Sequence, residues 1–194
     1  MIVTGKNKTP ASANAGGLAV KKDLDLYMRA ALREAGKCLA HGDVPVGAVV
    51  VFDGKIIARG HNVREKKNSP LWHAEMVAVE RASKKLGRWN LAGATLVVTK
   101  EPCAMCAGLV VQSRITKVVF GVGDVKGGCC GGALMVAASP SLNHRANIVG
   151  GVLERECLEM LKGFFGSLRR AKKAENVHKL TIYEHFDKIS DDED

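Results

Sequence analysis

Apolar residues recur along this chain with two different periods, and the change from one to the other predicts a protein of mixed helices and strands. From Asp23 they return every three or four residues up to about His41-Gly42, which predicts an amphipathic helix. A β-branched run from Val46 to Phe52 then meets Asp53-Gly54 and resumes at Lys55. This pattern is typical of two antiparallel strands joined by a two-residue turn.

The middle of the chain alternates helical and strand-like segments. The polar stretch from Asn62 to Ser69 is expected to form a loop. The pattern after it predicts a helix from about His73 to Lys85 and a strand at Ala94 to Thr99. It then predicts a second helix from about Pro102 to Ser113 and a strand at Lys117 to Gly121. Because strands separated by helices need crossover connections, we expect a sheet that is at least partly parallel.

The last part of the chain is harder to assign. After a glycine-rich loop from Gly121 to Gly132 we expect a short helix, a loop and a strand near Ile148. Apolar positions between Leu153 and Leu168 then mark a long amphipathic helix whose far end is basic. These patterns divide the chain into a disordered N-terminal extension (1–20), one domain (21–174) and a flexible charged tail (175–194).

Composition narrows the class of protein. The chain has 194 residues, of which 46% are hydrophobic and 25% charged, values that argue against wholesale disorder. Its net charge of +9 favours anionic partners, with nucleic acid first among them. No apolar run approaches the roughly 18 residues that span a bilayer. Six cysteines without a secretory signal at the start indicate a soluble protein of the reducing cytoplasm.

Two short motifs contain the candidate chemistry, and each lies where the chain enters a predicted helix. They are His73-Ala74-Glu75 and Pro102-Cys103-Ala104-Met105-Cys106. Cysteines three residues apart face the same side of a first helical turn, and two thiolates with one imidazole match the ligands of zinc. Three protein ligands leave the fourth position to water, whose proton the nearby Glu75 could carry. A structural zinc site would instead need a fourth ligand such as Cys129, Cys130 or His61.

Taken together, the two motifs match the signature of the zinc-dependent nucleobase deaminases. From about Leu24 to Lys173 the chain resembles more closely the tRNA-specific adenosine deaminases, which convert the wobble adenosine of a tRNA anticodon to inosine. Further segments that carry this resemblance are Asp43 to Val49, Gly60 to Asn62, Ser113 to Ile115, Asp124 to Cys129, Asn143 to Arg145, and Phe164-Phe165. The resemblance implies an α/β fold, a three-layer α-β-α sandwich around a five-stranded mixed sheet of the cytidine deaminase type, and a homodimer.

The resemblance also implies roles for individual residues. One Zn²⁺ per subunit would be held by His73, Cys103 and Cys106, and Glu75 would be the catalytic proton shuttle. Contacts with the substrate, a tRNA anticodon stem-loop, are expected from Asn62, Asp124, Lys126, Asn143, Phe165, Arg169 and Arg170. Leu71-Trp72 stand where many members of the family carry small residues, so the wall of the pocket is expected to differ there.

Several of these residues have a plainer interpretation. Asn62 could be a turn former after Gly60-His61, and Asp124 and Lys126 could be solvated charges of a loop. At least one residue of Phe164-Phe165 is expected in the core, and the basic run after them could simply favour a helix C-terminus.

Two other functions compete with tRNA editing. A deaminase of a free base or nucleoside, such as cytosine, cytidine or guanine, would use the same zinc site without the basic helix. A zinc-stabilised RNA-binding module would bind without turnover, and Glu75 argues against it.

Overall fold

The computed structural model describes the backbone of residues 13–190 and the side chains of residues 22–174. At its centre is one five-stranded sheet with the strand order β2-β1-β3-β4-β5. The strands are β1 (Gly47–Phe52), β2 (Lys55–His61), β3 (Thr95–Lys100), β4 (Lys117–Val122) and β5 (Asn147–Val149). β1 pairs antiparallel with both β2 and β3, whereas β3, β4 and β5 run parallel. The predicted mixed sheet is confirmed.

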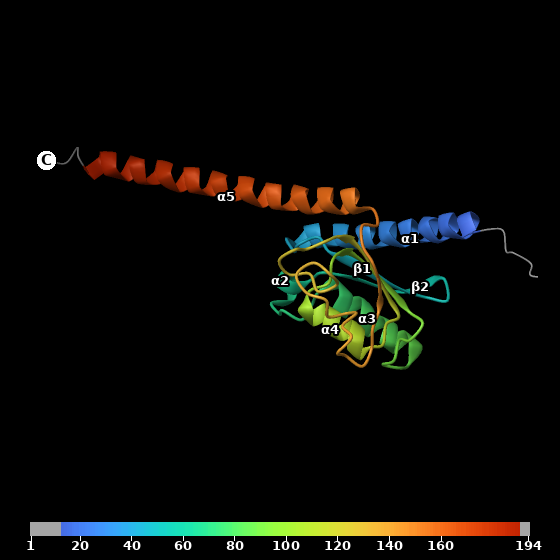
Figure 1. Ribbon diagram of the computed structural model, residues 1–194. Helices are drawn as coiled ribbons and strands as arrows, with labels where there is room; N and C mark the ends of the chain where they lie inside the picture. Colours follow the sequence, from blue (N-terminus) through green and yellow to red (C-terminus); the bar gives the residue numbers. More distant parts are fainter. Residues whose placement is uncertain (1–12, 191–194) are drawn as a thin grey trace, which may run out of the picture.

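Helices cover both faces of this sheet, which gives the expected three-layer sandwich (Figure 1). One face carries α1 (Ala13–Gly36) and α5 (Glu154–Ser190), and the other carries α3 (Ala74–Leu86) and α4 (Ala104–Gln112). Buried apolar side chains form a separate core on each side, with Met28, Val49 and Cys157 in one and Ala78, Val98 and Val110 in the other. The far half of α5 projects well beyond the sheet (Figure 1).

The hairpin of β1 and β2 forms as its sequence predicts. Asp53 and Gly54 both adopt positive φ angles, 48° and 69°, which is the backbone of the tight turn that Asp-Gly favours. Further along β2, a Cβ atom on Gly60 would lie 2.4 Å from the Ala74 carbonyl oxygen, so α3 packs directly on the strand backbone there. Gly60 thereby fixes the height of the α3 N-terminus above the sheet.

The two ends of the described chain differ from the predictions. α1 begins at Ala13, ten residues before the predicted start, in a segment that contains three alanines and no proline but also Gly16 and Gly17, so its helical propensity is mixed. α5 continues to Ser190 through a stretch that lacks both glycine and proline, so both helices cross the predicted domain boundaries. Residues 1–12 of the predicted extension and 191–194 of the predicted tail lie outside the described residues.

Two internal predictions were wrong. The stretch expected to be a loop after β2 contains a one-turn helix, α2 (Arg64–Lys67), because the buried Asp43 carboxylate accepts the N–H groups of Glu65 and Lys66 at its start. The short helix expected after Gly132 does not form. There the N–H groups of Ala133 and Leu134 donate to the Gly128 carbonyl, so tertiary contacts override helix propensity.

Within the part of the chain that the structure describes, no helix combines the length and the apolarity needed to cross a bilayer.

Candidate metal centre and active site

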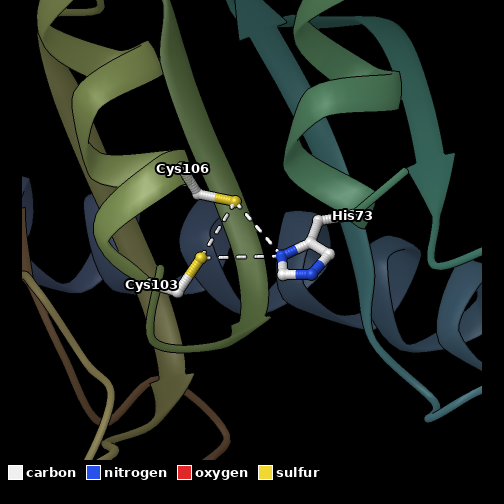
Figure 2. A group of neighbouring side chains, drawn as sticks. All are labelled: His73, Cys103 and Cys106. Atoms are coloured by element: carbon white, nitrogen blue, oxygen red, sulfur yellow. Dashed lines mark hydrogen bonds between the residues drawn. The ribbon is translucent and has the colours of Figure 1, made fainter. Parts of the chain in front are cut away.

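Three side chains predicted to bind a metal converge at the start of two helices. His73 is the N-cap residue of α3 and Cys103 is the N-cap residue of α4, each in extended conformation, while Cys106 lies in the first turn of α4. Their side chains point toward one another (Figure 2). Cys103 therefore lies just before the helix rather than in its first turn.

The distances within this cluster fit one tetrahedral ion. The two sulfur atoms are 3.7 Å apart, and each lies 3.6 Å from Nδ1 of His73. An ion about 2.3 Å from each sulfur and about 2.1 Å from the nitrogen, at tetrahedral angles, would separate these donors by about 3.75 Å and about 3.6 Å. Among the described residues the cluster holds only these three donors, and Cys129, Cys130 and His61 are not among them. The arrangement leaves one tetrahedral position open.

The thiols of the cluster are strongly coupled. A hydrogen bond from Cys106 lowers the pKa of the Cys103 thiol to about 3, so Cys103 is a thiolate at neutral pH. The same contact, together with burial, raises the pKa of Cys106. The interaction with Cys103 also raises the pKa of His73. A cation that binds all three donors must therefore displace the proton of the Cys106 thiol, so binding depends on pH.

Glu75 lies beside the cluster, at the wall of a cavity. It is buried in the first turn of α3, and burial raises the pKa of its carboxyl group above the ordinary value. The adjoining cavity has a volume of about 280 Å³, and its lining includes His73, Glu75 and Cys103. This volume is just below the roughly 300 Å³ at which pockets for drug-sized ligands begin, so it suits one planar base. A carboxyl group with a raised pKa at such a place can both accept and return a proton.

Asn62 forms another part of the cavity wall. Its side-chain amide donates to the Val44 carbonyl (3.2 Å) and accepts the Arg64 N–H (3.4 Å), so it has the turn-forming contacts that the plainer interpretation required. One amide N–H and one lone pair are still free to meet a ligand, because a primary amide offers two donors and two acceptor sites. Both interpretations of Asn62 are therefore compatible with its geometry.

The sequence did not reveal the role of Glu101, which organises the loop after β4. This buried carboxylate accepts the backbone N–H groups of Asp124 (2.8 Å), Cys130 (2.8 Å) and Gly132 (2.9 Å). A Cβ atom on Gly128 would lie 2.2 Å from the carboxylate, which explains why the loop is rich in glycine. In the sequence, Glu101 is only an acidic residue between an apolar strand and Pro102, and this position does not indicate which groups it contacts.

We predict that Glu101→Gln lowers the free energy of unfolding by about 2–3 kcal/mol. The amide would place an NH₂ group against N–H donors, and hydrogen bonds to a charged group are each worth about 1.5–3 kcal/mol. Urea denaturation of the variant beside Glu159→Gln, an exposed carboxylate on α5, measures the difference. Equal stability of the two variants would show that the loop does not depend on this carboxylate.

The remaining predicted contacts lie outside the cavity lining. The carboxylate of Asp124 pairs with Lys100 and accepts the backbone N–H groups of Lys126 and Gly127, while the Lys126 side chain is exposed. Asn143 accepts a hydrogen bond from Arg114 (2.8 Å) just beyond the C-terminal end of α4. That helix end is about 13 Å from the metal cluster, given a rise of about 1.5 Å per residue.

The predicted contacts on α5 are exposed and are not among the residues that line the cavity. Phe164 is 8% exposed and belongs to the core, as predicted for one of the pair, whereas Phe165 is 42% exposed. Arg169 and Arg170 are exposed on the same helix. Leu71 and Trp72 are not among the residues that line the cavity, and their effect on the shape of its wall stays a prediction. The ammonium of Lys67 lies over the Trp72 ring instead.

Comparison with known proteins gives a consistent set of relatives. Residues 22–169 match the family model of the MafB19-like deaminases. Over 150 residues the chain is 53% identical to the tRNA-specific adenosine deaminase of Bacillus subtilis, a match that covers 77% of this chain and 93% of that protein. The tRNA-specific adenosine deaminase of Haemophilus influenzae is 41% identical over 151 residues, which cover 77% of this chain and 87% of the relative.

A solved structure supports the same grouping. It comes from a study of A-to-I editing by tRNA:A34 deaminases at the wobble position of transfer RNA. It superposes on this chain with a TM-score of 0.66 at 37% sequence identity, and covers 70% of this chain and 99% of the solved one. The three layers and the mixed sheet are therefore those of a known deaminase fold.

Proposed function

This chain belongs to the MafB19-like deaminases and to the family of the tRNA-specific adenosine deaminases, and on that basis we propose that it hydrolytically deaminates the wobble adenosine of a tRNA anticodon loop to inosine. The observation that carries the proposal is the position of Glu75. It is a buried carboxyl group with a raised pKa, beside a three-donor metal cluster, at the wall of a cavity that suits one base.

Zinc is the metal that fits this cluster best. Two thiolates and an imidazole are soft to borderline donors, and three protein ligands with one open position are typical of catalytic rather than structural zinc. We propose that His73, Cys103 and Cys106 hold one Zn²⁺ per subunit. When bound, the ion would supply Lewis acidity that lowers the pKa of a water molecule in the open position.

The protein's own contribution to the reaction is proton transfer by Glu75. Its carboxylate takes a proton from the attacking water as the new C–O bond forms at C6 of the adenine ring. It then gives this proton to the ring nitrogen N1, takes the second proton from the new hydroxyl group on C6 and passes it to the exocyclic amine. The C6–N bond then breaks, C6 becomes a carbonyl carbon and ammonia leaves. Burial keeps this proton near the reacting atoms, because bulk water has little access to the carboxyl group.

Asn62 is proposed to orient the base for this attack. The edge of a purine presents donors and acceptors side by side, and the free N–H and lone pair of the Asn62 amide can pair with both. Its turn-forming contacts with Val44 and Arg64 fix the amide in place, so the two interpretations of this residue act together. Asn143 has no proposed part in this cavity within one subunit.

RNA beyond the target base is proposed to lie along α5 and the loop after β4. Exposed basic residues there are Lys126, Arg169, Arg170, Lys172 and Lys173, with the exposed ring of Phe165 on the same helix. An anticodon loop presents unstacked bases and single-stranded phosphates, which aromatic rings and basic side chains recognise. Five such contacts predict that log Kd changes with log[salt] with a slope of magnitude roughly 3.5.

The double variant Arg169→Ala/Arg170→Ala is expected to reduce the magnitude of this slope by about 1.4, because each lost contact with single-stranded phosphate removes about 0.7. Titration of a fluorescent anticodon stem-loop at several salt concentrations gives the slope. Lys84→Ala/Lys85→Ala, at the exposed end of α3, removes the same charge elsewhere and should leave the slope unchanged. An unaltered slope in the arginine variant would remove α5 from the RNA-binding surface.

We also propose that the protein forms a homodimer and acts in the cytoplasm. Large exposed apolar side chains on the loop after β4, Val125, Leu134 and Met135, support a homodimer, since exposed apolar patches often mark interfaces.

All six cysteines are free, which suits the reducing cytoplasm where tRNA is modified. We propose that residues 21–174 form the catalytic domain, with the flanking segments as additions.

The competing functions are separated by a panel of substrates. The zinc-loaded protein is incubated with an anticodon stem-loop that carries a wobble adenosine and, in parallel, with free adenosine, cytosine, cytidine and guanine, and inosine and ammonia are measured. Inosine in the RNA with inert free substrates supports the proposal. Turnover of a free base or nucleoside alone would identify a salvage enzyme, and binding of RNA without ammonia release would identify a noncatalytic module.

A further inference from the structure

A lysine lies in the wall of the cavity, in a position for which the proposed reaction has no use. Lys100 is the last residue of β3, three positions before the metal-binding candidate Cys103, and its side chain is 33% exposed. It lies at the carboxyl end of a parallel pair of strands, β3 and β4, where α/β sheets place their ligands. Lys100 therefore places a positive charge in the wall of the cavity proposed for the target base.

Lys100 is held in place by an ion pair with Asp124. That carboxylate is 24% exposed and lies two residues beyond the end of β4. It also accepts the backbone N–H groups of Lys126 (3.0 Å) and Gly127 (3.1 Å), and the Asp124 N–H is bound by Glu101. The loop therefore fixes the carboxylate, and the carboxylate fixes the ammonium group.

The pair leaves part of the ammonium group free. An ammonium has three N–H donors, and among the described residues Asp124 is the one partner of Lys100. The other cation in the cavity lining, Arg64, pairs with Glu65 at 3.5 Å with both side chains more than half exposed, so it is held less firmly. Lys100 is thus the better fixed positive charge at the cavity.

We infer that Lys100 binds a phosphate group of the RNA next to the target nucleoside, and that Asp124 holds Lys100 in place and competes with that phosphate when no RNA is bound. The inference rests on the proposed function and adds a contact that separates an adenosine within RNA from free adenosine, which has no phosphate. Lysine acts at such sites as a point charge that meets phosphate oxygens. In this account Asp124 affects RNA binding through Lys100 rather than by touching the base.

The competition predicts opposite effects for the two partners of one ion pair. Lys100→Met should raise KM for the stem-loop about threefold to tenfold and reduce the salt slope by about 0.7 to 1, with kcat within about twofold of wild type. Asp124→Asn keeps an oxygen for the two backbone N–H groups but removes the charge, so it should lower KM and steepen the slope.

If the ion pair between Lys100 and Asp124 only stabilised the fold, the two variants would behave differently from this expectation. Both variants would then be less stable and would change KM in the same direction, with the salt slope unaltered, and that result would overturn the inference. An increase of KM in Asp124→Asn would do so as well. Lys84→Met is the matched control, because Lys84 is likewise paired with a carboxylate, Glu80 (2.6 Å), on the exposed face of α3.

The same variants, built on the inactive Glu75→Gln protein, allow Kd for the stem-loop to be measured without turnover. If wild-type protein makes no inosine, the proposed function fails, while the Kd values still decide the role of Lys100. If wild-type protein edits the RNA and the Kd values of the two variants do not diverge, only the inference about Lys100 fails.

Discussion

Replacing Glu75 by glutamine is expected to lower kcat for wobble-adenosine deamination by about 10²- to 10⁴-fold, while the protein still binds one zinc ion per subunit. The amide has nearly the shape of the carboxyl group but cannot take a proton from water or return it to the ring, and general acid–base catalysis typically contributes this much. Folding should be preserved, because a neutral amide avoids the cost of burying a charge, the cause of the raised pKa of Glu75.

Single-turnover editing of a stem-loop and metal analysis of the same preparation measure both quantities. Glu80→Gln on the exposed side of the same helix is the matched control and should retain wild-type rates. If Glu75→Gln kept more than about a tenth of the wild-type kcat, another group would have to move the proton. The proposed mechanism would then be wrong even if the protein edits tRNA.

Cys106→Ala is expected to abolish both zinc binding and activity, with kcat/KM lower by more than about 10²-fold. The cluster holds three donors among the described residues, so the loss of one leaves two ligands and an incomplete site. Cys106 is fully buried, which gives water little room to replace the sulfur. Removal of zinc from wild-type protein by a chelator should reproduce the loss, and added Zn²⁺ should reverse it there but not in the variant.

Cys157→Ala is the matched control for this experiment. Cys157 is also a buried free thiol, but it packs in the core on the opposite face of the sheet. Its replacement should retain the metal and activity and cost about 1 kcal/mol of stability through the small cavity it leaves. A Cys106→Ala protein that still bound zinc and edited RNA would contradict the assignment of this cluster as the metal site.

The parts of the fold that sequence could predict are those with a local signal. The hairpin at Asp53-Gly54 depends on two residues that adopt positive φ, and the crossover between β3 and β4 follows from one helical period between two strands. The convergence of the three candidate metal donors was also predictable, because they lie at the N-cap or in the first turn of two consecutive helices that the pattern locates. In these places local propensity and tertiary packing agree.

The loop after β4 shows why the rest could not be predicted. Its conformation depends on Glu101, more than twenty residues earlier in the chain, which gathers three backbone N–H groups around one buried carboxylate. The helix-forming residues near Leu134 therefore remain irregular, and no local pattern signals this. The ion pair of Lys100 with Asp124 also joins residues far apart in the chain. The sequence therefore could not predict that Lys100 places a charge at the cavity wall.

The most direct test uses a full-length tRNA transcript with adenosine at the wobble position, treated with the zinc-loaded protein and read by reverse transcription. The account predicts that the wobble adenosine is read as guanosine in nearly all molecules, that other adenosines of the anticodon loop are unchanged, and that Glu75→Gln protein leaves the transcript unedited. An unedited transcript with active, zinc-loaded wild-type protein, or equal editing at every loop adenosine, would contradict it.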